Sequence, residues 1–464
     1  MKEKLYNSAP VWGQHLACSL EGWRLKHKRF GGRYSLIFEE VLARTAWSEE
    51  QVRSFRDRRL RSFIRHCVET VPFYRRRFRD LGISANDIQS MKDLEVLPIL
   101  RKDEVQDHSA ELLSETVSPS KRVAAHTSGT TGTGLVFKTT RAAIQEQWGV
   151  WWRFFHWHGL RPSVWCALFG IRSIAPLSQD QPPFWRYNIP GKQIVFSIHH
   201  MSLKNLDSYV SELRLRRPPW IHGFPSGLAL LAAHILESRN DLGYQVRWVT
   251  LGAENLLPHQ ADIIQRAFGV RPLQLYGMAE AVANFSECPF GSLHVDEDFA
   301  AVEFVPNPAG QGHKVIGTNF TNTATPLVRY DTQDLVTLSD SMCACGRPGR
   351  VVANVDGRLE DYVLLKDGVR FGRMDHIFKD LTRIREAQVL QKRPGEIVIR
   401  VVRGHLYGGA DEAVLRGECR RHLGEDTKVI IEYPDRLERS ENGKLRFVIS
   451  ELEKIDRPLS AKRG

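Results

Sequence analysis

The sequence has no long hydrophobic run. The longest, GLALLAAHIL, extends from Gly227 to Leu236, well short of the roughly 20 apolar residues that a membrane-spanning helix needs. The N-terminal segment MKEKLYNSAPVWGQHLACSL also lacks the uninterrupted apolar core of a secretory signal peptide. We therefore expect no membrane span and a cytoplasmic location.

Cysteine is scarce as well. Seven cysteines, an odd number, occur among 464 residues, which excludes a disulfide-stabilised secreted domain and favours a reducing compartment. The hydrophobic share of 42% and the charged share of 26% exclude a disordered or coiled-coil chain. Both values are typical of a globular enzyme with more than one folding unit.

Acidic residues are outnumbered by basic ones. The chain has 65 Lys and Arg against 54 Asp and Glu, a net charge of +11, which suits an anionic partner such as a nucleotide, CoA, nucleic acid or a membrane surface. Residues 50–80 are dense in Arg, and their apolar residues have the spacing of one helix face: Leu60, Phe63, Ile64, Cys67 and Val68. No aromatic-stacking module or zinc-finger spacing accompanies this helix, so we favour a solvated face and predict no specific nucleic-acid partner.

The pattern of apolar residues predicts the domain organisation. Between about residues 123 and 252, apolar runs alternate with helical patterns, which indicates an α/β domain with a largely parallel sheet. After Gly357 the pattern changes to short strands and helices of a small α+β domain. We predict a large N-terminal domain over residues 1–357, with a mainly helical opening over 1–120, and a small C-terminal domain over 358–464.

The most informative segment is HTSGTTGTGLVFK, from His126 to Lys138. Its glycines and hydroxyl side chains can form a turn whose N–H and O–H groups surround phosphate oxygens. It is not a Walker A loop, because Leu135 stands where that motif requires Lys. A Ser/Thr/Gly cluster by itself is most often a plain loop, so the rest of the chain has to decide.

Five further motifs follow in order: GAE at 252–254, YGMAE at 276–280, RYDTQD at 329–334, GRLED at 357–361 and ENGKLR at 441–446. Together with TSGTTG at 127–132, they resemble the signatures of the adenylate-forming superfamily of acyl-CoA ligases, adenylation domains and luciferases. The resemblance implies an α/β fold with a large N-terminal AMP-binding domain and a small mobile C-terminal lid. It also implies ATP-dependent activation of a carboxylic acid, with release of pyrophosphate.

Within that superfamily the chain is similar to phenylacetate:CoA ligases and to their homologues associated with capsular polysaccharide clusters. The similar segments are VPFYRRRF from Val71, DLEVLPILRKDE from Asp93, ECPFGSLHVDED from Glu287 and CACGRPGR from Cys343. The similarity is weakest between about residues 140 and 250, where a Trp-rich segment starts at Trp148. Its aromatic residues fit either an acyl pocket or a core helix face, and we favour the core.

The resemblance assigns roles residue by residue. Lys444 would support adenylation, Glu280 would help to hold Mg²⁺, and Glu360 would be the hinge between the domains. The remaining nucleotide-binding positions are Thr127, Ser128, Gly129, Thr130, Thr131, Gly132, Gly252, Ala253, Glu254, Tyr276, Gly277, Asp334 and Arg358. His222, Phe224 and Pro225 fall where the family places part of its acyl pocket.

The chain departs from the family at several motif positions. Thr133 and Gly134 follow the phosphate loop where Lys-Pro is common, and Asp331 and Gln333 replace an Arg and a Gly of the ribose motif. These changes keep an alternative open beside an acid:CoA ligase, namely adenylation followed by transfer to an amine, a hydroxyl or a carrier-protein thiol. A non-catalytic nucleotide-binding protein is a further alternative, against which the retention of Glu280, Asp334, Arg358 and Lys444 argues.

Four residues form a candidate zinc site. Cys343 and Cys345 make a Cys-x-Cys pair, and Cys288 and His294 lie in a segment similar to the subfamily's cysteine-bearing stretch. Three thiolates and an imidazole would complete a closed tetrahedral site of the structural type. Ordinary buried or free cysteines remain the alternative, and we assign packing roles to Cys18, Cys67, Cys166 and Cys419.

Overall fold

The structure is a computed structural model. It describes residues 2–126, 135–170, 174–176, 178–238, 241–308, 312–358, 363–366, 370–371, 374–378, 381, 383–404, 407–439 and 445–452. Within these ranges no helix has the length and hydropathy to cross a bilayer.

The described helices are α1 Lys2–Ser8, α2 Val11–Phe30, α3 Tyr34–Ala43, α4 Glu49–Thr70, α5 Pro72–Asp80, α6 Lys102–Asp107, α7 Arg141–Trp157, α8 Leu206–Arg216, α9 Pro225–Glu237, α10 Pro258–Phe268 and α11 Gly409–Leu423. The described strands are β1 Arg122–His126, β2 Val136–Thr140, β3 Cys166–Gly170, β4 Trp185–Asn188, β5 Gln193–Ser197, β6 Trp220–Gly223, β7 Trp248–Leu251, β8 Pro272–Gly277, β9 Asn284–Glu287, β10 Leu293–Val295, β11 Ala300–Pro306, β12 His313–Asn319, β13 Tyr330–Leu338, β14 Val351–Arg358, β15 Val363–Leu364, β16 Arg370–Phe371, β17 Ile384–Arg393, β18 Glu396–Arg403, β19 Lys428–Glu432 and β20 Val448–Ser450.

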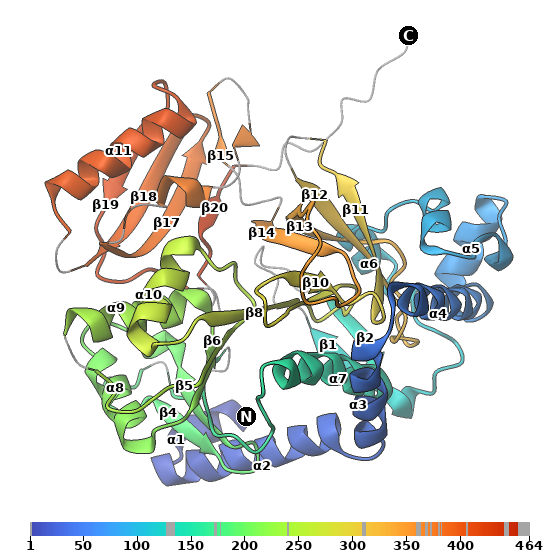
Figure 1. Ribbon diagram of the computed structural model, residues 1–464, viewed down its shortest axis with the longest axis horizontal. Coiled ribbons are helices and arrows are strands. Elements are labelled where there is room, and N and C mark those ends of the chain that lie inside the picture. Colours follow the sequence, from blue (N-terminus) through green and yellow to red (C-terminus); the bar gives the residue numbers. More distant parts are fainter. Residues whose placement is uncertain are drawn as a thin grey trace.

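A long mixed sheet forms the centre of the molecule (Figure 1). In the described chain its strand order is β11-β12-β13-β14-β10-β9-β8-β7-β6-β3-β5-β4. Strands β5, β3, β6, β7 and β8 are parallel neighbours. From β8 the sheet continues with antiparallel neighbours in the order β8, β9, β10, β14, β13, β12 and β11. The predicted parallel α/β region is therefore confirmed, and an antiparallel half extends from it.

Helices cover both faces of the parallel half. Side chains alternate along each strand, so that Ile221 of β6 packs in a core with α8, α9 and α10, while the adjacent Trp220 packs with Trp152 and Phe155 of α7. The Trp-rich segment thus forms a helix whose central aromatic residues are core residues, which is the interpretation that the sequence favoured. Burial on both faces explains why these strands have almost no polar alternation.

The Arg-rich segment forms two helices, α4 and α5. A capping box on Ser48 begins α4, and Pro72 begins α5, where its missing N–H costs no helical hydrogen bond. The predicted stripe is buried: Leu60, Phe63, Ile64 and Cys67 pack in a core that also includes Tyr330 of β13. The basic side chains of this region cover a packed helix, as expected.

A second sheet lies at the C-terminal end, with the strand order β19-β18-β17-β20. It has a core of its own, in which Leu415 and Cys419 of α11 pack on Val389, Ile397 and Val401. Figure 1 shows this unit beside α9 and α10, at the end of the molecule away from α2. The boundary that we predict after Gly357 falls inside β14, which pairs with β13 as far as Arg358, and the division into 1–357 and 358–464 stays a prediction.

Candidate active site

Several predicted site residues meet at one edge of the sheet. His222, the segment 252–254 and Gly277 lie at or just after the carboxyl ends of the neighbouring strands β6, β7 and β8. Ligands of open α/β sheets bind outside the carboxyl ends of the strands. Motifs separated by tens of residues are therefore brought together by parallel pairing alone.

Glu254 is the best-defined side chain at this edge. One carboxylate oxygen accepts from the backbone N–H of Ser226 at 3.1 Å, in the first turn of α9. The other oxygen accepts from the backbone N–H of Leu445 at 2.8 Å. Since Leu445 belongs to the C-terminal segment, this carboxylate connects the two parts of the chain.

Two arginines of the C-terminal unit reinforce the same contact. Arg439 donates to the Ser226 hydroxyl at 2.9 Å and pairs with the buried Glu386. At the other end of α9, Arg385 pairs with Glu237. Sequence reasoning missed Arg439, because nothing in its local pattern distinguishes it from the chain's many other arginines.

Tyr276 and Asp334 form a second connected pair. The phenol O–H of Tyr276 donates to an Asp334 carboxylate oxygen at 2.7 Å, and burial raises the pKa of Tyr276 well above its ordinary value. The phenol is therefore a neutral donor. Its ring stacks on Phe285, with centroids 4.4 Å apart and planes 18° apart, so one face of the aromatic ring is already packed.

The turn that holds Asp334 is rigidly built. The Asp334 N–H donates to the Thr332 hydroxyl at 3.1 Å, and that hydroxyl donates to the Val315 carbonyl at 2.9 Å. Gln333, which replaces a glycine of the family motif, has a φ of 64°, a left-handed conformation that costs an L-residue energy. Gln333 therefore adopts a backbone conformation that glycine adopts without this cost.

The segment from Gly277 to Glu280 is held by amide groups. A Cβ on Gly277 would lie 2.7 Å from the Asn284 side-chain oxygen, so a larger residue would clash there. Asn319 donates its side-chain amide to the Glu280 carbonyl at 3.0 Å. The Glu280 side chain is half-buried.

The three candidate pocket residues differ in their surroundings. His222 Nδ1 lies 2.8 Å from the Thr250 hydroxyl, and burial lowers the pKa of His222 to about 4, so its imidazole is neutral near pH 7. Phe224 is buried in the core beneath α8 and α9. Pro225 is the first residue of α9 and is also buried.

Several predicted positions lie outside the described residues: Thr127, Ser128, Gly129, Thr130, Thr131, Gly132, Glu360 and Lys444, while Arg358 is described in its backbone alone. Their described neighbours are informative. His126 of β1 pairs opposite Val136 of β2, so antiparallel strands flank the predicted phosphate loop. Asp334 is the backbone partner of Arg358 between β13 and β14.

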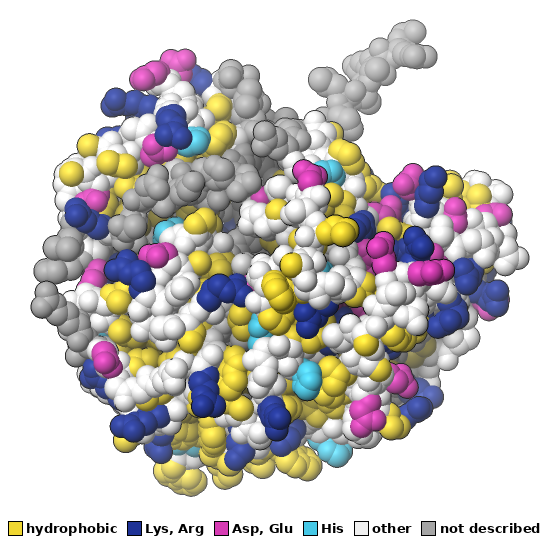
Figure 2. Space-filling model, viewed as in Figure 1, with side chains coloured by type: hydrophobic (Ala, Val, Ile, Leu, Met, Phe, Trp, Pro, Cys, Tyr) yellow, Lys and Arg dark blue, Asp and Glu magenta, His cyan; other side chains and the backbone are white. Residues whose placement is uncertain are grey.

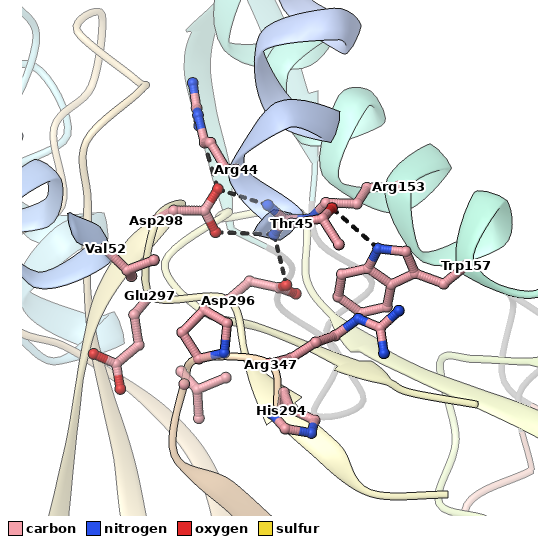
Figure 3. Close-up of a pocket in the computed structure, with 13 residues that line it drawn as sticks. Arg44, Thr45, Val52, Arg153, Trp157, His294, Asp296, Glu297, Asp298 and Arg347 are labelled. Carbon is pink, nitrogen blue, oxygen red and sulfur yellow. Dashed lines mark hydrogen bonds and ion pairs between the residues drawn. The ribbon is translucent and has the colours of Figure 1, made fainter. Parts of the chain in front are cut away.

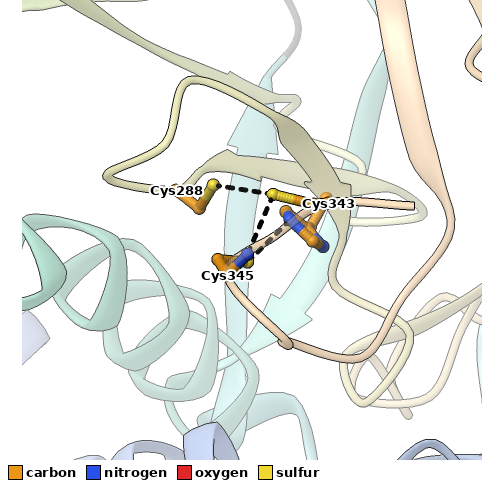
Figure 4. Close-up of side chains that lie close together, drawn as sticks. Cys288, Cys343 and Cys345 are labelled. Atoms are coloured by element: carbon orange, nitrogen blue, oxygen red, sulfur yellow. Dashed lines mark hydrogen bonds between the residues drawn. The ribbon is translucent and has the colours of Figure 1, made fainter. Parts of the chain in front are cut away.

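The four predicted metal ligands are brought together, from the β9–β10 turn, β10 and the loop before β14 (Figure 4). The ligand atoms of Cys288, His294, Cys343 and Cys345 all lie within 4.8 Å of one another. Cys288 Sγ is 3.6 Å from Cys343 Sγ, and Cys345 Sγ is 3.3 Å from His294 Nε2. Sulfur atoms around a tetrahedral zinc would be about 3.8 Å apart, given Zn–S bonds of ~2.3 Å, so the spacing fits that ion.

The thiols of this cluster differ in their acidity. Burial raises the pKa of the Cys288 thiol to about 11. Burial acts in the same direction on Cys343, but hydrogen bonds from Ser292, Cys345 and His294 outweigh it and lower the pKa of Cys343 to about 6. The His294 Nδ1 atom has no hydrogen-bond partner among the described residues, while Nε2 faces the sulfur atoms.

A buried ion network lies beside this cluster and was not predicted. Arg153 of α7 donates to Asp296 at 2.8 Å and to Asp298 at 2.7 Å, and Arg44 also contacts Asp298, as Figure 3 shows. The cavity that these residues line holds about 20 Å³, room for roughly one water molecule. The network therefore joins α7 to the loop after β10. The cavity beside it is too small to be a substrate pocket.

The chain is similar in sequence to known proteins. A family model described as the CapK C-terminal domain matches residues 365–451. Protein CapK of Staphylococcus aureus is 24% identical over 468 residues, which cover 97% of this chain and 100% of CapK. A phenylacetate-coenzyme A ligase of Thermus thermophilus is 26% identical over 331 residues, 68% of this chain and 72% of that ligase.

Solved structures of 2-hydroxyisobutyryl-CoA ligase also align with the chain. In the postadenylation state, in complex with 2-HIB-AMP, that ligase gives a TM-score of 0.68 at 20% identity, covering 88% of this chain and 91% of the other. In the thioesterification state, with 2-HIB-AMP and CoA, the TM-score is 0.53 over the same shares of the two chains at 20% identity. The fold is that of the adenylate-forming ligases, with a large α/β body and a C-terminal α+β unit.

Within that class, the chain is related to CapK and to the phenylacetate-coenzyme A ligases. The resemblance that its motifs indicated is thereby confirmed.

Proposed function

We propose that this protein uses ATP to convert a small carboxylic acid into an acyl-adenylate, with release of pyrophosphate, and then transfers the acyl group to CoA. The observation that carries the proposal is the hydrogen bond from the Leu445 N–H to Glu254. It holds the C-terminal segment at the sheet edge where the predicted nucleotide-binding segments end. Leu445 is the first described residue after Lys444, our candidate for adenylation.

The first half-reaction joins a carboxylate oxygen to the α-phosphorus of ATP and breaks the bond to pyrophosphate. Negative charge increases on the phosphate oxygens during this step, so a fixed cation there stabilises the transition state more than the ground state. Lys444 would supply that cation. The segment 127–132 would hold the outgoing phosphates through its N–H and hydroxyl groups.

The nucleoside would be oriented by Tyr276 and Asp334. A carboxylate can accept from both ribose hydroxyls, and the neutral Tyr276 phenol fixes the carboxylate by donating to one of its oxygens. Gly252 and Ala253 precede Glu254 at the adenine side. Because Tyr276 stacks on Phe285, its ring is pre-oriented and loses little rotational freedom when a base packs beside it.

The arrangement of the two units is more similar to a postadenylation state than to a thioesterification state. The TM-score is higher with 2-hydroxyisobutyryl-CoA ligase in its postadenylation state than in its thioesterification state. Rotation about Glu360 would withdraw Lys444 after adenylation and open the acyl carbonyl to attack by a thiol. One site would then serve both half-reactions in turn.

Two metal ions would assist. Glu280 would provide an oxygen ligand to Mg²⁺ bound between phosphates, which offsets their charge. Cys288, His294, Cys343 and Cys345 would hold a structural Zn²⁺, since their donor set and spacing fit a closed tetrahedral site. That ion would fix the β9–β10 turn to the loop before β14, away from the sheet edge where the nucleotide would bind.

A second acyl acceptor stays a candidate. Similarity to CapK covers 97% of the chain, and the C-terminal unit, which would meet the acceptor, is the part that matches the CapK domain. An amine, a hydroxyl or a carrier-protein thiol would then take the place of CoA. The CoA dependence of AMP release, measured with an acid that is activated, separates the two cases.

The decisive test is Lys444→Ala. We expect carboxylate-dependent ATP–pyrophosphate exchange to fall by about a hundredfold or more, because the cation that stabilises the transition state is lost. Thioester formation from supplied acyl-adenylate should remain close to wild type. Lys428→Ala, at an exposed lysine of the same unit that pairs with Glu396, is the matched control, and unchanged exchange in Lys444→Ala would contradict the proposal.

The acid itself is best found by screening. Exchange measured over aliphatic, hydroxy and aromatic acids would identify the substrate class without assuming an acceptor. Acids that fit beside His222 should compete with one another, and a panel without any exchange would contradict adenylation.

A further inference from the structure

An apolar stripe runs along the outside of α2. Trp12, Leu16, Leu20 and Trp23 are 71%, 56%, 61% and 61% exposed. At 3.6 residues per turn, these four side chains fall within an arc of about 80° on one face of the helix. Large apolar residues gathered on one exposed helix face mark an interaction surface.

The opposite face of α2 anchors the helix to the body of the protein. Gln14 accepts from Arg186 of β4 at 2.8 Å, and Gly22 lies so close to Asn188 that a Cβ would be 1.8 Å from its side-chain oxygen. Packing on β4 therefore fixes α2 and leaves the stripe facing outward. Ile189, also exposed, adjoins the stripe, because its N–H donates to the Ser19 hydroxyl of α2.

Basic residues flank the stripe. Between Val11 and Arg33 the chain has five Lys or Arg and a single acidic residue, Glu21. Arg24, His27 and Lys28 of α2 also line a surface groove together with Arg122 and Arg141. Figure 2 shows hydrophobic side chains along the lower edge of the molecule, where Figure 1 places α2, with Lys and Arg side chains close to them.

We propose that α2 docks the protein on the surface of an anionic lipid bilayer. The stripe would enter the boundary between headgroups and acyl chains, where tryptophan is favoured, while the flanking cations would meet lipid phosphates. No described helix is long and apolar enough to span a bilayer, so this contact is peripheral and reversible.

The charges favour a lipid surface over a second copy of the chain. A two-fold dimer through this face would bring two sets of these cations together, and like charges across an interface are unfavourable. An anionic bilayer offers the opposite charge. In Figure 1 the C-terminal unit lies at the far end of the molecule from α2, so docking through α2 leaves that unit unobstructed.

The test is flotation of the full chain with lipid vesicles. We expect binding to phosphatidylcholine vesicles that contain about 30% phosphatidylglycerol, and at least about tenfold less binding to phosphatidylcholine alone. Binding to the anionic vesicles should decline as NaCl rises from about 0.05 to about 0.5 M, because salt screens the headgroup charge. This salt series requires no variant.

Variants distinguish the contribution of the apolar stripe to vesicle binding from that of the basic residues. The double variant L16E/L20E should lose at least about tenfold of the binding to anionic vesicles, because it places carboxylates in the apolar stripe. Leu215→Glu is the matched control, since Leu215 is 69% exposed on α8 and lies outside the stripe. It should bind like wild type. R24E/K28E should lose binding to anionic vesicles, and unchanged far-ultraviolet circular dichroism would verify that each variant is folded.

Three results would overturn the proposal. One is equal binding of wild type to the two kinds of vesicle, and another is no binding to either. The third is a wild-type dimer, seen by light scattering, that L16E/L20E converts into a monomer while vesicles bind neither form. That last result would assign the stripe to a second copy of the chain.

Discussion

The Glu254 carboxylate accepts a hydrogen bond from the Leu445 N–H at 2.8 Å. Its other oxygen accepts from the Ser226 N–H, so both oxygens are engaged by backbone donors from different parts of the chain. A backbone N–H donor cannot be removed by a substitution at its own position without larger effects on the structure. The acceptor, a side-chain carboxylate, can be replaced. Glu254 is therefore the residue through which docking of the C-terminal segment is best tested.

Glu254→Gln should weaken this docking. An amide offers one acceptor oxygen instead of two and turns an N–H group toward the remaining donor, and a hydrogen bond to a charged group is worth about 1.5–3 kcal/mol. We expect pyrophosphate exchange to fall by about 10- to 100-fold. Thioester formation from supplied acyl-adenylate should fall by less than pyrophosphate exchange does, because that half-reaction does not need the docked segment.

Glu237→Gln provides the control for Glu254→Gln. Glu237 is at the far end of α9, where it pairs with Arg385 of the C-terminal unit, so it belongs to the same contact but not to the predicted site. Its exchange rate should stay within about threefold of wild type. Equal losses in the two half-reactions of Glu254→Gln would contradict a docking role.

The pair Tyr276 and Asp334 gives a second prediction. Asp334→Asn removes the charge that would accept the ribose hydroxyls and should raise the KM for ATP by about 10- to 100-fold. Tyr276→Phe keeps the ring on Phe285 and loses only the O–H donor. We expect it to lower the free energy of unfolding by about 1 kcal/mol and to raise the KM for ATP less than Asp334→Asn does. A KM for ATP in Asp334→Asn within twofold of wild type, measured by exchange, would refute this role for Asp334.

The parallel part of the sheet and the order of the motifs could both be predicted from the sequence. The alternation of apolar runs indicated the parallel half of the sheet, in which Gly252 directly follows β7 and Tyr276 lies on the adjacent β8. Asp334 lies on β13, in the antiparallel half, and reaches Tyr276 by a side-chain hydrogen bond. The alternation of apolar runs with helical patterns depends on local periodicity, which can be read from the sequence alone. The resemblance also paired Cys288 with Cys343 across 55 residues, and the fold brings both sulfur atoms within 3.6 Å.

The contacts of Glu254 could not be predicted in the same way. Its donors lie 28 residues before it and 191 residues after it, and a backbone N–H has no sequence signature. Arg153 was hidden within an aromatic helix, and its partners Asp296 and Asp298 follow a predicted zinc ligand. Gln333 marks a further limit, because its residue type gives no sign of its φ of 64°, and only the resemblance to a motif with glycine at this position points to it.

The metal site gives a third prediction. Protein purified without added zinc should contain about one zinc per chain, and Cys345→Ser should lower that content well below one because the site loses a thiolate. Removing the metal with a chelator should lower Tm by roughly 5 °C, since the ion would fix two loops to each other. Cys18→Ala, at a cysteine outside the cluster, should leave both values unchanged. A metal content below about 0.2 equivalents in wild type would exclude a structural zinc.

The last prediction concerns His222 and pH. Burial lowers its pKa to about 4 in the folded protein, whereas an unfolded histidine has a pKa of about 6.5. Between these values the unfolded chain binds more protons than the native one, so the stability contributed by the neutral imidazole is complete above about pH 6.5 and is lost as the pH falls toward 4. The slope from this single group approaches about 1.4 kcal/mol per pH unit.

His222→Asn should remove that slope, because an amide can still contact the Thr250 hydroxyl but does not titrate over this range. The variant is expected to be less stable than wild type at pH 7, and the difference between their free energies of unfolding should shrink as the pH falls to about 4.5. Urea unfolding at several pH values measures this difference directly. Burial also lowers the pKa of His259 to about 4, but its contribution is the same in both proteins and cancels in the difference. A pH profile of His222→Asn that stays parallel to wild type would show that the imidazole of His222 is not held neutral by burial.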